Sequence, residues 1–123
     1  MASHNTKQRK LIHEVIGAAE GPLSAAEVHE RCQERLPRIG QATVYRNLRQ
    51  LVDEGELTTV ELPGDRQRFE RADLGHHHHF QCRGCDQVFD LDGCPGPLRE
   101  LAPSGFTVER HEVVLYGLCS ECA

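Results

Sequence analysis

Two Cys-x-x-Cys pairs and a run of four histidines constrain the fold of this 123-residue chain more than any other feature. The pairs are Cys82 with Cys85 and Cys119 with Cys122, and the histidines occupy positions 76–79, just upstream of the first pair. One Cys-x-x-Cys turn can present two thiolates to the same ion, and a structural zinc site takes four tetrahedral ligands. The two pairs therefore predict one four-thiolate zinc site that pins the end of the chain back onto the region of Cys82. A redox dithiol and a disulfide pair are the alternatives.

The length of the chain allows one ordinary domain or two small ones. Half of it alone would bury little apolar surface, so a metal or a partner is expected to stabilise it. The chain has no apolar leader of the signal-peptide type and no apolar run approaching about 18 residues. These absences exclude a membrane span and predict a cytoplasmic protein, in which thiols stay reduced and available to metal.

The formal net charge of −5 is unevenly distributed along the sequence. Up to Arg71 there are 11 Lys or Arg and 11 Asp or Glu, whereas from Ala72 onward there are 3 and 8, which gives 3 − 8 = −5. All the excess acid therefore lies in the half that carries the Cys pairs and the histidine run. Carboxylates mixed with histidines suit divalent metals, although an acidic solvated surface is the simpler alternative.

The first half of the chain predicts three helices followed by a β-hairpin. Apolar residues recur at helical spacing over 7–19 and 44–52, and a Ser24-x-x-Glu27 capping box starts a helix that runs to about Leu36. Residues 57–62 and 66–70 are extended segments joined by a Pro-Gly-Asp turn, which indicates a hairpin. Three short helices followed by a hairpin describe a winged helix-turn-helix, here at residues 1–71.

The second half predicts a smaller unit with strands. A hinge at 72–75 is followed by expected strands at 80–82, 88–91 and 106–115, with one or two turns of helix at 97–102. The predicted fold class is therefore α+β, with a winged-helix domain followed by a small α/β metal-binding domain at residues 76–123.

The order of these motifs resembles the ferric uptake regulator (Fur) superfamily of bacterial metal-dependent repressors. The resemblance covers nearly the whole chain: the capped helix, Ala-Thr-Val-Tyr-Arg at 42–46, the hairpin, the histidine run, the first Cys pair, His111, and Leu-Tyr-Gly-x-Cys-x-x-Cys at 115–122. It implies a homodimeric transcriptional repressor of metal homeostasis and not an enzyme. The winged helix would bind a palindromic double-stranded operator, and the second domain would dimerise and hold the metals. No membrane and no small-molecule substrate is expected.

The resemblance also implies three metal sites. The four paired cysteines match the family's structural zinc, the sensing site falls on Glu70, His77, His79 and Asp90, and the second site falls on His76, His78 and His111. Because alternate side chains of a strand point to opposite faces, one histidine run can supply two sites. In the family an acidic residue completes the second site. This sequence offers Cys94 at that place, with Asp92 and Glu100 as rivals.

Two departures from the family pattern bear on the metal. Iron and peroxide sensors of the family place a histidine directly before the second helix, where this chain has Pro22, and zinc sensors often have a cysteine where it has Ala72. The four donors left in the sensing site fit tetrahedral Zn²⁺ better than the higher coordination that Fe²⁺ or Mn²⁺ prefers. We therefore expect a zinc sensor resembling the zinc uptake regulators, with an iron, manganese or peroxide sensor of the same superfamily as the alternative.

DNA-binding residues are expected mainly on the third helix. An exposed Arg46 can pair with guanine, and the ring of Tyr45 can pack on a thymine methyl group. The residues expected to contact phosphates are Arg49, Lys7, Arg9 and Lys10. Two other classes compete with this interpretation. A zinc-dependent hydrolase would need an open coordination position, and the chain has no His-Glu-x-x-His motif. A metal-binding module without a DNA role would leave residues 42–46 and the hairpin unexplained.

Overall fold

A computed structural model of the chain describes residues 4–123. These residues form two compact units, of which the first ends at Gly75 and the second comprises His76–Ala123. The division falls at the end of segment 72–75, which the sequence predicts as a hinge. None of the described helices is long and apolar enough to cross a membrane.

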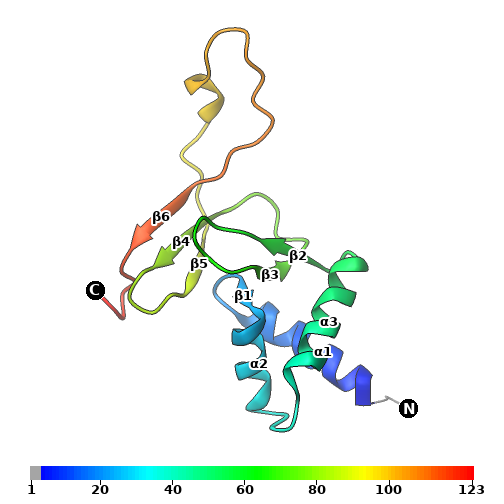
Figure 1. Cartoon of the computed structure of the whole chain (residues 1–123). Helices are drawn as coiled ribbons and strands as arrows, with labels where there is room; N and C mark the ends of the chain where they lie inside the picture. Colours follow the sequence, from blue (N-terminus) through cyan, green and yellow to red (C-terminus); the bar gives the residue numbers. More distant parts are fainter. Residues whose placement is uncertain (1–3) are drawn as a thin grey trace. The chain divides into compact units, whose positions relative to one another are not determined.

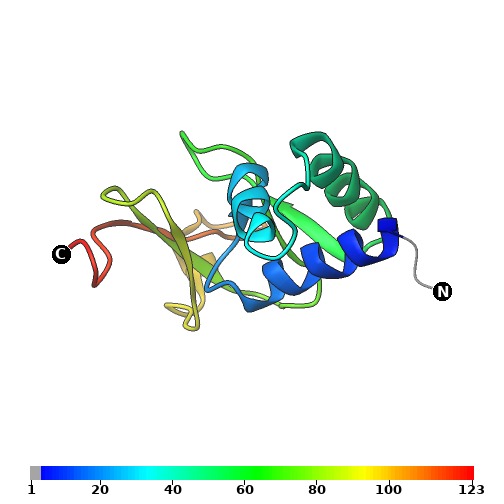
Figure 2. The same ribbon diagram turned by 90° about the horizontal axis from the view of Figure 1, so that it is seen from below.

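The N-terminal unit is a winged helix-turn-helix, in which three helices pack beside a small antiparallel sheet (Figures 1 and 2). Its elements are α1 (His4–Ala18), β1 (Leu23–Ser24), α2 (Ala25–Gln33), α3 (Gln41–Asp53), β2 (Leu57–Val60) and β3 (Arg68–Arg71). The strands lie in the order β1-β3-β2, so β2, β3 and the turn between them form the predicted hairpin. The two-residue strand β1 was not predicted, because two residues show no periodicity.

The start of α2 follows from the capping box. The Ser24 hydroxyl oxygen accepts from the backbone N–H of Glu27 at 3.2 Å, and the Ser24 N–H donates to the Glu27 carboxylate at 2.9 Å. The helix ends at Gln33 and not at Leu36 as expected. The N–H of Leu36 still donates to the carbonyl of Cys32, but the chain turns away there before Pro37.

The helices of this unit bury their apolar faces in one core. The buried residues that pack together are Leu11, Ile12, Ile16, Leu23, Val28, Cys32, Ile39, Val44, Leu48, Leu51, Leu57 and Phe69. They come from all three helices and all three strands, and they include the stripes predicted from helical spacing. The core holds α3 with its opposite face in solvent, where Tyr45, Arg46 and Arg49 are exposed.

The C-terminal unit is built on a three-stranded sheet and a long loop. Its elements are β4 (His78–Cys82), β5 (Val88–Leu91), the short 3-10 helix η1 (Leu98–Leu101) and β6 (Val114–Gly117). Strand β4 is central; it pairs antiparallel with β5 and parallel with β6. Residues 92–113, here called the excursion, leave the sheet after β5 and return to it at β6 (Figure 1).

The strand predicted at 106–115 is wrong over most of its length, because only Val114–Gly117 forms a strand. The pairing register gives the reason. Val114 lies opposite His79, close to the first residue of β4, so the residues before Val113 run past the end of β4 and have no strand beside them. Alternation of side chains cannot form a ladder where no partner strand lies alongside.

Candidate metal centres and DNA-binding surface

The two Cys-x-x-Cys pairs come together in the C-terminal unit. Ligand atoms of Cys82, Cys85, Cys119 and Cys122 lie within 4.8 Å of one another, and the sulfurs of Cys85 and Cys119 are 3.9 Å apart. Four sulfurs at about 2.3 Å from a tetrahedral zinc ion lie about 3.8 Å apart, so the spacing fits one ion. All six cysteines are free thiols in the structure, which leaves no disulfide in this cluster.

Backbone N–H groups near the cluster stabilise the thiolate form of Cys82, which is the form that binds a cation. Backbone N–H groups of Cys119, Cys85 and Gly84 donate to the sulfur of Cys82 at 3.3, 3.5 and 3.3 Å, and they lower the pKa of Cys82 to about 6. A hydrogen bond with Cys119 raises the pKa of Cys122, to about 12. A side chain at Gly84 would put a Cβ 2.9 Å from the Cβ of Cys122, so the close approach of the pairs requires glycine there.

Three of the four residues predicted for the sensing site also meet in the C-terminal unit. The Nε2 atoms of His77 and His79 each lie 3.5 Å from Oδ1 of Asp90, and their ring centroids are 4.8 Å apart. The pairing of β4 with β5 sets this geometry, because His79 stands directly opposite Asp90. Nitrogen and oxygen ligands of a tetrahedral zinc ion lie about 3.3 Å apart, which matches these distances. Glu70, the fourth predicted ligand, lies on β3 of the N-terminal unit, opposite Thr58.

The other face of the histidine run takes part in a third donor cluster. Ligand atoms of His76, His78, Cys94 and His111 lie within 4.8 Å of one another. Nε2 of His111 is 3.1 Å from Nε2 of His76 and 3.2 Å from the sulfur of Cys94. Among the described residues, the cluster contains Cys94 and neither of its rivals from the sequence, Asp92 and Glu100.

His78 is the deepest member of this cluster. It is 2% exposed, and its Nδ1 accepts a hydrogen bond from the backbone N–H of Val113 at 3.2 Å. Burial lowers the pKa of His78, and the neighbouring imidazoles act in the same direction, so the ring is neutral, as metal ligation requires. Its Nε2 is buried without a hydrogen-bond partner in the described part of the chain. The position of this ring beside a thiol and two more imidazoles fits a metal ligand set, and ligation through Nε2 would require the ring proton to move to Nδ1, which would end the hydrogen bond from Val113.

The predicted base-reading residues lie on the solvent face of α3. Tyr45 is half exposed, and Arg46 and Arg49 are exposed. Tyr45 and Arg49 line a shallow pocket together with Thr59, Gln67 and Phe69 of the hairpin. Residues of the helix and of the wing therefore line one pocket, and Arg46 is exposed on the same helix.

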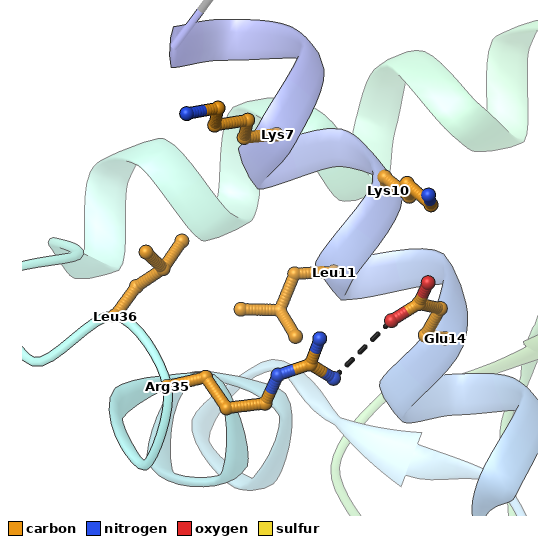
Figure 3. Close-up of a pocket in the computed structure, with 6 residues that line it drawn as sticks. All are labelled: Lys7, Lys10, Leu11, Glu14, Arg35 and Leu36. Atoms are coloured by element: carbon orange, nitrogen blue, oxygen red, sulfur yellow. Dashed lines mark hydrogen bonds and ion pairs between the residues drawn. The ribbon is translucent and has the colours of Figure 1, made fainter.

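The predicted phosphate-contacting residues of α1 differ in their surroundings. Lys7 and Lys10 are exposed at the edge of a pocket in which Arg35 reaches across to Glu14 at 3.2 Å (Figure 3). Arg9, in contrast, pairs with Glu54 directly and with Glu56 at 3.4 Å. Lys7 and Lys10 are exposed, whereas Arg9 would have to leave its carboxylate partners to contact a phosphate.

Arg68 is a residue of this unit that the sequence did not single out. Its side chain is 3% exposed, and it donates to Asp65 at 2.5 Å, to Glu27 at 2.7 Å and to the carbonyl of Pro22 at 3.2 Å. Arg68 thus ties the hairpin to the start of α2. Pro22 stands where some relatives were expected to have a histidine ligand, and here its carbonyl is a partner of this guanidinium. The hydrogen bond from Arg68 to Pro22 joins residues more than 40 positions apart, so no local pattern could have predicted it.

Fold and site together define a class: a winged-helix protein whose second unit gathers cysteines and histidines into metal-binding clusters. The sequence profile of the Ferric uptake regulator family matches residues 2–116, and the chain belongs to this family. Members are metal-responsive transcriptional regulators and not enzymes, and they bind operator DNA, typically as dimers.

Three similar proteins illustrate the range of the family. The ferric uptake regulation protein of Bordetella parapertussis is 36% identical over 103 residues, which cover 81% of this chain and 74% of that protein. The Vibrio cholerae ferric uptake regulator superposes with a TM-score of 0.71 at 30% identity, covering 91% of this chain and 88% of that one. FurB of M. tuberculosis, described as a zinc uptake regulator, gives a TM-score of 0.53 at 27% identity, with coverage of 97% and 95%. Relatives named for iron and for zinc thus both resemble this chain.

Proposed function

We propose that this protein is a zinc-responsive repressor that binds a palindromic double-stranded operator as a homodimer in the cytoplasm. The observation that supports this proposal most directly is the composition of the donor clusters. One is made of four thiols, and another combines three imidazoles with a thiol. Soft sulfur and borderline nitrogen donors favour Zn²⁺ over Mn²⁺, and closed four-ligand sets suit its tetrahedral geometry.

The sensing site would consist of Glu70, His77, His79 and Asp90. The imidazoles and the Asp90 carboxylate already lie at ligand spacing within the C-terminal unit. Glu70 is assigned by resemblance to the family, and it belongs to the N-terminal unit. Four donors drawn from two units restrain those units when they share one ion, and this restraint would select the arrangement in which two recognition helices fit a palindrome. By linkage, operator DNA must then tighten metal binding by the same factor.

Zinc is favoured over iron and manganese because of the donor count. Pro22 supplies no nitrogen ligand, and its carbonyl is hydrogen-bonded to Arg68. The site would therefore hold four protein ligands, which suits tetrahedral zinc, whereas Fe²⁺ and Mn²⁺ favour larger sets of oxygen and nitrogen donors. An iron or manganese sensor with water completing the coordination shell is the competing function, and the resemblance to ferric uptake regulators favours it.

The test is a metal-buffered titration of operator binding. An operator is first selected from random DNA duplexes with the zinc-loaded protein, and binding is then followed by fluorescence anisotropy at fixed free Zn²⁺, Fe²⁺ or Mn²⁺. We expect half-maximal binding at much lower free Zn²⁺ than free Fe²⁺ or Mn²⁺. Equal or better activation by Fe²⁺ under anaerobic conditions would overturn the zinc assignment.

His79→Ala tests whether the sensing cluster couples metal to DNA. The variant should keep its fold and its four-thiolate zinc but lose metal-dependent operator binding. His13→Ala is the matched control, because His13 is a partly exposed histidine of α1 outside all three donor clusters. Wild-type operator affinity in metal-free His79→Ala protein would contradict the coupling.

A further inference from the structure

We propose that His29 of α2 is a positioning residue for operator binding, because its imidazole fixes the turn from which α3 starts. Nε2 of the ring donates a hydrogen bond to the carbonyl oxygen of Ile39 at 2.9 Å, and Ile39 directly precedes the N-cap of α3. The proposal rests on the proposed function in one respect, that α3 reads the bases of the operator. Among the described residues His29 belongs to none of the three donor clusters, so this role is separate from metal binding.

The start of α3 has no side-chain cap of its own. Its N-cap is Gly40, which has extended backbone and makes no side-chain hydrogen bond to the first amides of the helix. Helix α2, in contrast, begins with the complete capping box of Ser24 and Glu27. A capping side chain satisfies free amides and helps to fix the direction in which the chain enters a helix. In α3 that direction depends on the residues that precede Gly40.

The turn between α2 and α3 has few other restraints (Figure 1). Of residues 34–40, all of which the structure describes, only Ile39 is buried, with 5% of its surface exposed. Leu36 is half-buried, and the other residues of the turn are exposed. The place of the turn therefore depends on how Ile39 is held, through its side chain in the core and through its backbone.

Hydrogen bonds tie the backbone of Ile39 to α2 on both sides. Its N–H donates to the carbonyl of Leu36 at 3.0 Å, and the N–H of Leu36 donates to the carbonyl of Cys32 at 2.8 Å. The carbonyl of Ile39 accepts from His29, which lies three residues before Cys32 on α2. These bonds form a closed ring that begins and ends on α2, and the imidazole of His29 is the side-chain group that closes it.

The acceptor determines the state of the ring. A carbonyl oxygen only accepts, so Nε2 of His29 holds the proton. The neutral ring in that tautomer and the imidazolium can both donate it, and the bond therefore survives protonation of the ring. Two substitutions separate the donor from the ring. Phenylalanine has a ring without a donor, whereas the amide of glutamine has a donor without a ring.

The expected consequence for DNA binding is selective. Tyr45 and Arg46 lie in the first two turns of α3, so a change at the start of the helix displaces them from the base edges. Hydrogen bonds to base edges supply discrimination between sequences and depend on geometry. Contacts to phosphates, expected from Lys7 and Lys10 of α1, have no sequence information. Loss of the His29 bond should therefore lower affinity for the operator and leave affinity for unrelated DNA unchanged.

The experiment compares full-length His29→Phe and His29→Gln with the wild type. His13→Phe is the matched control, because His13 is a partly exposed histidine of α1 outside the turn and outside the donor clusters. Affinity is measured for the selected operator and for a scrambled duplex of the same composition, at a free metal concentration that saturates the wild type. We expect the ratio of the two affinities to fall about tenfold in His29→Phe, as when one base contact is weakened. It should stay within about threefold of the wild type in His29→Gln and His13→Phe.

Hydrogen exchange of the DNA-free proteins, followed by mass spectrometry, is the second measurement. Peptides covering 36–46 should exchange faster in His29→Phe than in the wild type or His29→Gln, while peptides of α1 stay unchanged. His29→Leu, which also lacks a donor, repeats both measurements with a smaller side chain and replaces His29→Phe if that variant does not fold.

Three results would overturn the proposal: a wild-type affinity ratio in the variants without a donor, an equal loss in His29→Gln, or equal weakening on operator and scrambled DNA. The zinc assignment is tested apart from it. If Fe²⁺ and not Zn²⁺ activates binding of the wild type, that assignment fails, and the His29 comparison is made with Fe²⁺ and keeps its meaning.

Discussion

The two units of this protein are stabilised in different ways. Of the buried hydrophobic residues in the described chain, fourteen belong to the N-terminal unit, whereas the C-terminal unit contributes only Cys82 and Val88. Cys82 is itself a predicted zinc ligand. The N-terminal unit therefore resembles an ordinary small domain with an apolar core, and the C-terminal unit has donor clusters in the place of a core.

Exposed apolar side chains show the same contrast. In the described part of the N-terminal unit, the only large apolar residues that are well exposed are Tyr45 and Leu74. In the C-terminal unit there are six such residues: Leu101, Phe106, Val108, Leu115, Tyr116 and Leu118. A unit of 48 residues cannot bury enough of its own surface, and metal ions and a second subunit are the usual remedies. The contrast predicts that metal binding stabilises the fold of the C-terminal unit in addition to its proposed role in sensing.

The largest expected effect comes from removing one thiolate of the four-cysteine cluster. Cys119→Ser should unfold the C-terminal unit and abolish the dimer, because structural zinc contributes on the order of 10 kcal/mol of folding free energy. The helical N-terminal unit should remain folded. Sedimentation and far-ultraviolet circular dichroism measure the two parts of this prediction. A dimeric Cys119→Ser protein with an unchanged melting temperature would show that the cluster is not the support of this unit.

Leu48→Ala should have the opposite effect: it should destabilise the N-terminal unit and leave the zinc of the C-terminal unit in place. Leu48 is fully buried in the core of the N-terminal unit, and truncating such a side chain costs about 2–5 kcal/mol. Differential scanning calorimetry should show a lowered transition for this unit, while zinc content, determined by mass spectrometry, stays at the wild-type value. Leu118→Ala is the matched control, since that leucine is 43% exposed and its loss should hardly change the transition of the N-terminal unit. Loss of zinc in Leu48→Ala would mean that the two units depend on each other for folding.

The smallest expected effect concerns the start of α2. Ser24→Ala removes the hydroxyl that accepts from Glu27 N–H, and loss of such a cap costs about 1 kcal/mol. The melting transition of the N-terminal unit should fall by a few degrees without any change in zinc content. Ser24→Asp should restore most of the stability, because a carboxylate can also cap the helix. Equal stability of Ser24→Ala and wild type would indicate that the ion pairs of Arg68 hold this end of α2 without the cap.

Much of the N-terminal unit could be predicted because its signals are local. The capping box and the apolar stripes of α1 and α3 depend on residues within a few turns, and all three helices are present, although α1 begins at His4 and not at Lys7 and α2 ends before Leu36. The hairpin was also predicted, although β3 begins at Arg68 and not at Arg66. The donor clusters were harder to predict. Their residue types were evident, but which residues meet depends on the pairing of β4 with β5 and β6.

The failures came from contacts between distant residues. Strand alternation after Phe106 was visible in the sequence, but the absence of a partner strand beyond His79 was not. The sequence favoured Cys94 for the second site but left Asp92 and Glu100 as rivals, and the path of the excursion places Cys94 against His111. The buried guanidinium of Arg68 likewise depends on Glu27, which lies far away in sequence.

The run of four identical histidines has a consequence for the pairing register of β4. Shifting a strand by one residue moves every side chain to the opposite face. A run of four identical residues does not distinguish the shifted register from the native one, because each face would again receive two imidazoles. The alignment must be fixed by neighbours that differ from one another, and one of them is Cys82, which is fully buried at the end of the same strand. The predicted four-thiolate zinc site would therefore help to fix the register that directs His76 and His78 to one donor cluster and His77 and His79 to the other.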